Sequence, residues 1–243
     1  MDRSFTLIAA LACAACAACV HRAPPSPIAI EYNTRCAEAL AAGQLDEAEA
    51  LCDHSLEFCD SYWDAQTNKG LIRKLRNDRE GAKAWFIRAV RNNENQHQAA
   101  NNLGVMYLED GRLAEAEAMF HQALKGNPDY AEARSNLASV HLRQRKFAQA
   151  EKAYRQLIIS APLVTNGYLG LGRALLLQQK AADAVPPLEH AVLLEPGRAE
   201  AWLLLAGARL DLGQRDGAKD AVGRCLDEDP SEPDCRRLAR ELQ

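Results

Sequence analysis

The chain has 243 residues, of which 48% are hydrophobic but only 6% are aromatic. This composition suits thin helix-to-helix packing over small side chains better than one large globular core. The formal net charge of −4 at pH 7 argues against nucleic acid as the main partner, because a phosphate-binding face needs clustered Lys and Arg.

The first element is an uncharged apolar run over residues 5–18, which follows Met1-Asp2-Arg3-Ser4. The run is shorter than the roughly 20 residues that a helix needs to span a bilayer, and it matches a secretory signal sequence. It ends in small residues and cysteines and resembles a bacterial lipobox, in which a cysteine is acylated and becomes the mature N-terminus. We expect a signal peptide over 1–18 and lipidation of Cys19, with Cys13 and Cys16 as alternatives.

A lipidated N-terminus and a proline-rich spacer are expected over residues 19–28, since three prolines, Pro24, Pro25 and Pro27, favour an extended chain. The residue after Cys19 is Val20, which is not acidic. By resemblance to the sorting of bacterial lipoproteins, this implies a lipid-anchored protein of the outer membrane that faces the periplasm.

Six contiguous blocks of 34 residues follow without a spacer: 29–62, 63–96, 97–130, 131–164, 165–198 and 199–232. The eighth position of each block is small and the twentieth is always alanine, which lets two helices approach closely. Most blocks carry a bulky residue at the twenty-fourth position, and the later blocks carry proline at the thirty-second. The period and the pattern resemble the tetratricopeptide repeat, a helix-turn-helix unit. The resemblance implies an all-α solenoid of six repeats, closed by a C-terminal capping helix over 233–243.

The cysteines beyond the N-terminus lie in an oxidising compartment if the chain is exported, so disulfides are expected. Cys36 and Cys52 stand at the eighth and twenty-fourth positions of the first block, on antiparallel helices about equally far from their turn. Cys225 lies late in the last block and Cys235 early in the end helix. We predict both bridges, although Cys59 competes for the first, and the alternative is that all remain reduced as small buried residues.

The partner-binding groove of such a solenoid is its concave face, lined by the first helix of each repeat. Asparagines gather there at or beside the sixth position of the second to fourth blocks: Asn68, Asn101, Asn102 and Asn136. An asparagine offers both a donor and an acceptor to the backbone of an extended peptide, although asparagine is also simply frequent in such repeats. Four leucines, which could seat a hydrophobic segment or instead contact the end helix, occupy groove positions of the last two blocks: Leu169, Leu176, Leu203 and Leu210.

No catalytic group of residues is recognisable. The six histidines show no pair at helical spacing, no cysteine at zinc-ligand spacing and no serine partner, and the glycines form no phosphate-binding fingerprint. We therefore expect a protein-binding module rather than an enzyme, with no metal, no cofactor and no small-molecule substrate.

A lipoprotein signal followed by six such repeats resembles the pilotin group of type IV pilus outer-membrane lipoproteins, of the Tgl type and more distantly similar to PilF and PilW. The resemblance implies a non-enzymatic factor that binds the pilus secretin subunit and promotes its assembly in the outer membrane, with Cys19 as the acylated residue. The alternative is a lipid-anchored periplasmic scaffold for gliding-motility or peptidoglycan enzymes.

Overall fold

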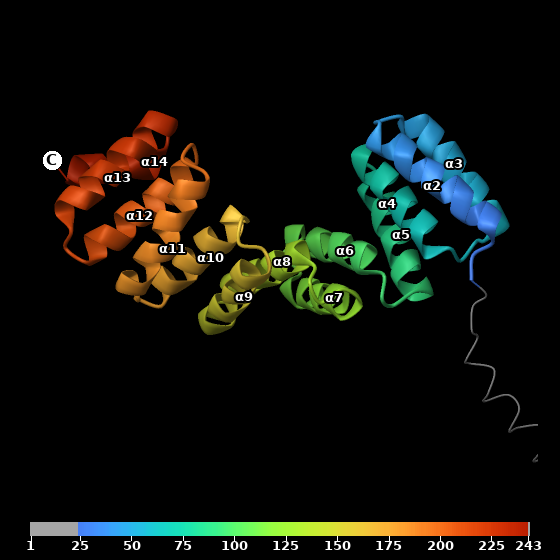
Figure 1. The fold of residues 1–243 in the computed structure, drawn as a ribbon, viewed down its shortest axis with the longest axis horizontal. Coiled ribbons are helices and arrows are strands. Elements are labelled where there is room, and N and C mark those ends of the chain that lie inside the picture. The colour runs from blue at the N-terminus through green and yellow to red at the C-terminus, as the bar shows by residue number, and fades with distance from the viewer. Residues whose placement is uncertain (1–23, 243) are drawn as a thin grey trace, which may run out of the picture. The chain divides into compact units, whose positions relative to one another are not determined.

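A computed structural model describes residues 24–242, and all regular elements among them are α-helices, arranged as consecutive antiparallel pairs followed by one last helix (Figure 1). The expected all-α repeat architecture is confirmed. The expected lipidation site, Cys19, and the apolar run before it lie outside the described residues. Within 24–242, no helix combines the length and the apolar character needed to cross a membrane.

Each block of 34 residues supplies one helix pair, and the register is the same from block to block. The second helix begins at the seventeenth residue of every block, and the first helix begins at the first residue of every block after the first. The turn between them carries a residue with positive φ at the fifteenth position: Gly43, Asn77, Gly111, Arg145, Gln179 and Gly213. Glycine adopts this left-handed conformation without strain, so three of the six turns use the residue best suited to it.

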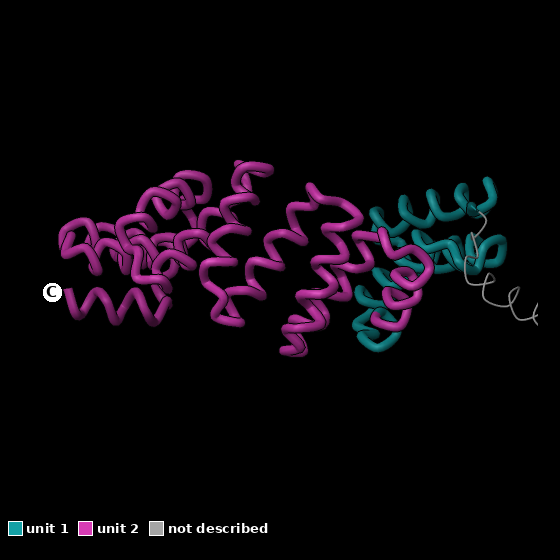
Figure 2. Tube along the Cα trace, turned by 90° about the horizontal axis from the view of Figure 1, so that it is seen from below, with its two compact units in different colours: residues 1–82 teal, residues 83–243 magenta. Residues whose placement is uncertain are grey.

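The chain divides into two compact units, residues 1–82 and 83–243 (Figure 2). The first unit contains α2 (Pro27–Ala41), α3 (Leu45–Phe58), α4 (Trp63–Leu75) and the beginning of α5 (Arg79–Asn92). Helix α2 starts with Ser26 as its N-cap, whose hydroxyl accepts from the backbone N–H of Ala29, and with Pro27 in the first turn. A serine cap followed by proline is a strong start signal, because the serine accepts from a free backbone N–H and proline has no N–H that needs a partner.

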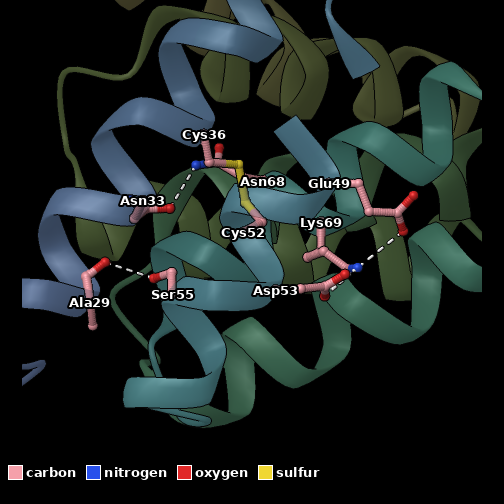
Figure 3. Close-up of a disulfide and its surroundings, with 9 residues drawn as sticks. All are labelled: Ala29, Asn33, Cys36, Glu49, Cys52, Asp53, Ser55, Asn68 and Lys69. Carbon is pink, nitrogen blue, oxygen red and sulfur yellow. Dashed lines mark hydrogen bonds and ion pairs between the residues drawn. A yellow bond between two sulfur atoms is a disulfide. The ribbon is translucent and has the colours of Figure 1, made fainter. Parts of the chain in front are cut away.

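The core of the first unit is cross-linked. Cys36 of α2 and Cys52 of α3 form a disulfide with Cα atoms 5.4 Å apart, and both residues are fully buried. Nearby, the ammonium group of Lys69, whose side chain is only 4% exposed, pairs with Glu49 at 3.0 Å and with Asp53 at 2.6 Å (Figure 3). A buried lysine is stable only when such partners offset its desolvation, which explains a charge where the repeat pattern usually has leucine.

The second unit continues the pairs with α6 (His97–Glu109), α7 (Leu113–Gly126), α8 (Ala131–Arg143), α9 (Phe147–Ser160), α10 (Thr165–Leu177), α11 (Ala181–Leu194), α12 (Ala199–Asp211), α13 (Arg215–Glu228) and α14 (Pro233–Glu241). Helix α7 packs against α8, α9 against α10, and α11 against α12. One hydrophobic core, which includes Tyr154, Leu188 and Leu205, runs from α8 to the C-terminal end.

Close approach within a pair depends on the eighth and the twenty-fourth positions together. A Cβ atom added to Gly104 would lie 2.7 Å from the ring of Phe120, and one added to Gly172 would lie 2.4 Å from Leu188. In these two repeats the bulky twenty-fourth residue packs over the small eighth residue. In the fourth repeat the twenty-fourth residue, Tyr154, lies against Gly170 of the next repeat, so this position fills space both within and between repeats.

The last helix, α14, closes the end of the second unit. A disulfide joins Cys235 of α14 to Cys225 of α13, with Cα atoms 6.3 Å apart. Leu242, 2% exposed, belongs to the core, and Leu238 packs partly against it. The helix thus covers the apolar side of α13 with its leucines and presents arginines to solvent.

Candidate partner-binding groove

A polar groove of about 510 Å³ lies within the second unit. Its walls come mainly from the first helices of two consecutive repeats, α8 and α10, and from the start of α12. The lining residues are Ser135, Asn136, Ser139, Leu142, Arg143, Tyr154, Asn166, Leu169, Gly170, Arg173, Leu177, Arg198 and Glu200. First-helix lining is what the repeat family leads one to expect of a peptide groove.

One wall of the groove is built by Tyr154 of α9, whose ring lies directly against the backbone of α10. A Cβ atom at Gly170 would come within 2.1 Å of that ring, so only glycine fits there. The hydroxyl of Tyr154 is 3.2 Å from that of Ser139. Burial raises the pKa of Tyr154 although the Ser139 hydrogen bond and the charge of Arg173 act in the opposite direction. The phenol therefore stays neutral, as a polar contact in a packed wall.

The groove carries an excess of positive charge, since it contains three arginines and one carboxylate. Glu200 pairs with Arg173 and, at 3.1 Å, with Arg198. Arg198 also donates to the side-chain oxygen of Asn166 at 2.8 Å, while Arg143 is exposed and donates to the backbone carbonyl of Leu108 at 3.2 Å. Two cations share one anion here, so the groove is suited to an acidic or carboxylate-bearing ligand.

The predicted asparagines are largely engaged with other side chains. The amide of Asn136 donates to Asn101 at 3.0 Å, and the amide of Asn68 donates in the same way to Asn33 at 2.9 Å. Each accepting asparagine also hydrogen-bonds a tyrosine that ends its own repeat, Tyr130 or Tyr62. The two arrangements are equivalent: the sixth residue of one repeat is tied to the fifth residue of the repeat before it.

Asn102 has no such partner, because the fifth residue of the preceding block is Thr67 and not asparagine. Its amide donates to the backbone carbonyl of Gln98, one turn earlier on α6, at 2.9 Å. Of these asparagines, Asn136 lines the groove, where its second N–H and its carbonyl oxygen can contact a ligand.

Only one of the four predicted leucines lines the groove in the structure. Leu169 is 4% exposed and lines the groove. Leu176 and Leu210 pack partly against the core, and Leu203 is half-buried. The arginines and Tyr154 were not predicted as groove residues, because they come from four different segments whose proximity depends on the stacking of helix pairs.

Comparisons with known proteins agree with this architecture. Sequence profiles described as tetratricopeptide repeat match residues 73–131, 107–165 and 175–242. No curated protein sequence matches the chain.

Solved structures of similar fold include three that are matched over nearly their own full length. PilF of Pseudomonas aeruginosa superposes with a TM-score of 0.77 at 18% identity, covering 88% of this chain and 97% of its own. PilW, described as a widely conserved type IV pilus biogenesis factor, gives 0.71 at 18% identity, covering 88% and 99%. YrrB, described as having an unusual peptide-binding site, gives 0.69 at 16% identity, covering 78% and 97%.

Proposed function

Because the chain belongs to the tetratricopeptide repeat family, we propose that it works by holding a protein partner in the groove between α8, α10 and α12. The partner that we propose is the type IV pilus secretin subunit, so that the protein acts as a pilotin. The similarity in fold to PilF and PilW supports this choice. The role requires no chemistry on the partner, and we propose that the protein is not an enzyme.

The observation that carries the proposal is the charge and shape of the groove. Arg143, Arg173 and Arg198 surround a polar trough, with Glu200 as the single carboxylate in its lining. An extended acidic segment of the partner would replace part of the hydration of these guanidinium groups with charge-assisted hydrogen bonds. The side chain of Asn136, at the edge of the same groove, would contact the backbone of that segment.

Anchoring completes the proposed role. We propose that residues 1–18 are removed, that Cys19 is acylated and that the protein faces the periplasm from the outer membrane. A captured secretin subunit would then be held at the surface where its neighbours accumulate, and the raised local concentration would favour assembly.

Deleting the gene tests the proposal in cells. We expect secretin monomers to remain while the heat-resistant multimer and surface pili are lost, and Cys19→Ala to restore them poorly in comparison with the wild-type protein. Labelled palmitate should enter the wild type and not Cys19→Ala. Normal multimers in the deletion strain would reject the pilotin role and favour the alternative, a scaffold for gliding-motility or peptidoglycan enzymes.

A further inference from the structure

A group of three potential metal ligands lies between α7 and α8, apart from the residues that line the groove. Glu117 and His121 are four residues apart on α7 and so share one face of that helix, and His141 comes from α8. One ligand atom from each residue lies within 4.8 Å of the other two.

The distances suit a small divalent ion. Zinc binds imidazole nitrogen at about 2.0–2.1 Å and carboxylate oxygen at about 2.0–2.2 Å in a tetrahedral arrangement, so neighbouring ligand atoms are roughly 3.3 Å apart. Nε2 of His141 lies 3.3 Å from Oε1 of Glu117, which is long for an N–H···O hydrogen bond. The imidazole of His121 is exposed and can rotate toward the same point.

Glu117 also accepts contacts from the next repeat, and this set of contacts, here called the tie, recurs along the chain. Gln144 donates to Oε2 of Glu117 at 2.8 Å, and the ammonium group of Lys146 lies 3.1 Å from the same atom. Thirty-four residues later, Gln178 and Lys180 make the equivalent contacts to Oε2 of Glu151, at 2.9 and 3.2 Å. Glutamate, glutamine and lysine at these positions therefore serve the packing of consecutive repeats.

The histidines do not belong to that tie. At the next repeat junction, the position of His121 is taken by Arg155 and the position of His141 by Leu175, and the tie still forms there. Leu175 is 1% exposed and belongs to the core. An apolar residue thus fills this position well, and packing alone does not call for an imidazole.

Burial of His141 leaves polar atoms without partners. Its side chain is only 9% exposed, and both its Nδ1 atom and the Oε1 atom of Gln144 are buried without a hydrogen-bond partner. Buried polar atoms nearly always have one, and leaving one without costs about 1–3 kcal/mol. This cost distinguishes the junction from the next one, where a buried leucine fills the same position, so packing alone does not explain the histidine.

We propose that Glu117, His121 and His141 bind one Zn²⁺ ion, with the fourth position open to water or to a side chain of a partner. Gln144 would hold the carboxylate of Glu117 in place through its other oxygen, as outer ligand partners commonly do. Lys146, whose side chain is 43% exposed, can turn to solvent when the carboxylate of Glu117 binds the ion. The ion would connect the third repeat to the fourth, at the junction that leads into α8 and the groove.

The test uses the protein without a histidine tag, because such a tag would itself bind metal. We expect one Zn²⁺ per chain, a tetrahedral Co²⁺ absorption spectrum that Zn²⁺ displaces, and a Tm that rises with zinc concentration because the ion binds the folded state. His121→Arg and His141→Leu copy the next junction, so they should keep full helicity. They should weaken zinc binding by about tenfold or more, since the loss of even an outer partner of a ligand costs about 10- to 100-fold.

His54→Ala is the matched control, since His54 also lies 3.1 Å from a glutamate, Glu57, but on an exposed surface with no third ligand. It should bind zinc as the wild type does. The proposal is overturned if the wild type binds no zinc in stoichiometric amount, if His121→Arg binds as tightly as the wild type, or if His54→Ala removes binding. The exposed position of His121 keeps the test decisive even if His141→Leu fails to fold.

Discussion

At the scale of single residues, the asparagines show how repeat position decides the role of a side chain. Asn68 and Asn136 are held by an asparagine of the preceding repeat, whereas Asn102 bonds only to its own helix. The difference depends on the residue 35 positions earlier, which is asparagine in two cases and threonine in the third. Periodicity predicted which face these residues share, but their partners are known only once the repeats are stacked.

Replacing Asn136 and Asn102 separately by Ala tests this assignment. Asn136→Ala should lower the free energy of unfolding by about 1–3 kcal/mol, because it leaves Asn101, which is 6% exposed, as a buried acceptor without its donor. Asn102→Ala should change the free energy by less than about 0.5 kcal/mol, as is usual for surface positions. Urea unfolding measures both. Equal effects of the two changes would show that the hydrogen bond between Asn136 and Asn101 adds nothing to stability.

The ion cluster around Glu49 predicts a dependence of stability on pH. Burial opposes ionisation of Glu49, but the hydrogen bond and charge of Lys69 and the charges of Arg73 and Arg76 outweigh it, so its pKa is lowered. A carboxyl group with a lowered folded pKa stabilises the protein above its unfolded pKa of about 4.3, and this stabilisation is lost as pH falls through the folded value.

Glu49→Gln should therefore be less stable than the wild type at pH 7, and the gap should narrow as the pH falls below about 4. Thermal unfolding at a series of pH values measures the gap. Glu57→Gln is the control, because Glu57 is an exposed carboxylate at 65% exposure with a single histidine neighbour. A gap for Glu49→Gln that stays constant with pH would mean that the lost stability is not electrostatic.

At the scale of helices, the same contact within a pair is made by different chemistry in different repeats. The eighth and twenty-fourth residues meet as glycine and phenylalanine in the third repeat, Gly104 and Phe120, and as glycine and leucine in the fifth. In the first repeat the same two positions form the Cys36–Cys52 disulfide. The small eighth residue was evident from the sequence, and the two cysteines predicted its contact with the twenty-fourth residue in the first repeat. In the other repeats helix rotation decides whether position twenty or position twenty-four meets it.

The Cys225–Cys235 bridge should be essential for the end helix. Cys235→Ser should lower the free energy of unfolding by about 2–4 kcal/mol, because the bridge closes a loop in the unfolded chain and fixes α14 to α13. Peptide mapping without reductant should find the two cysteines linked. Cys59→Ser is the control, since Cys59 forms no disulfide. Two alkylatable thiols at 225 and 235 would contradict the prediction.

At the scale of the molecule, the 34-residue period was enough to predict the helices and their pairing, because each repeat has small and apolar residues at the same positions. The groove was predicted only in location. Asn136 and Leu169 were recognised as groove residues and line it, but Arg143, Arg173 and Arg198 were not. Their charges come from the end of one helix, the middle of another and a turn, and no sequence window contains them together.

The central claim is that a protein partner is bound through the positive groove of the second unit. Its most direct test is the affinity of the purified secretin subunit for two variants with the same change of charge, Arg143→Glu in the groove and Lys152→Glu outside its lining. Circular dichroism should first show that both variants keep the helicity of the wild type.

We predict that Arg143→Glu weakens binding by about tenfold or more and that added salt reduces the difference from the wild type, since the lost contact is electrostatic. Lys152→Glu should bind within about twofold of the wild type, as expected of an exposed charge outside the groove lining. Equal affinities of Arg143→Glu and Lys152→Glu, or no binding of the secretin subunit by the wild type, would contradict the account.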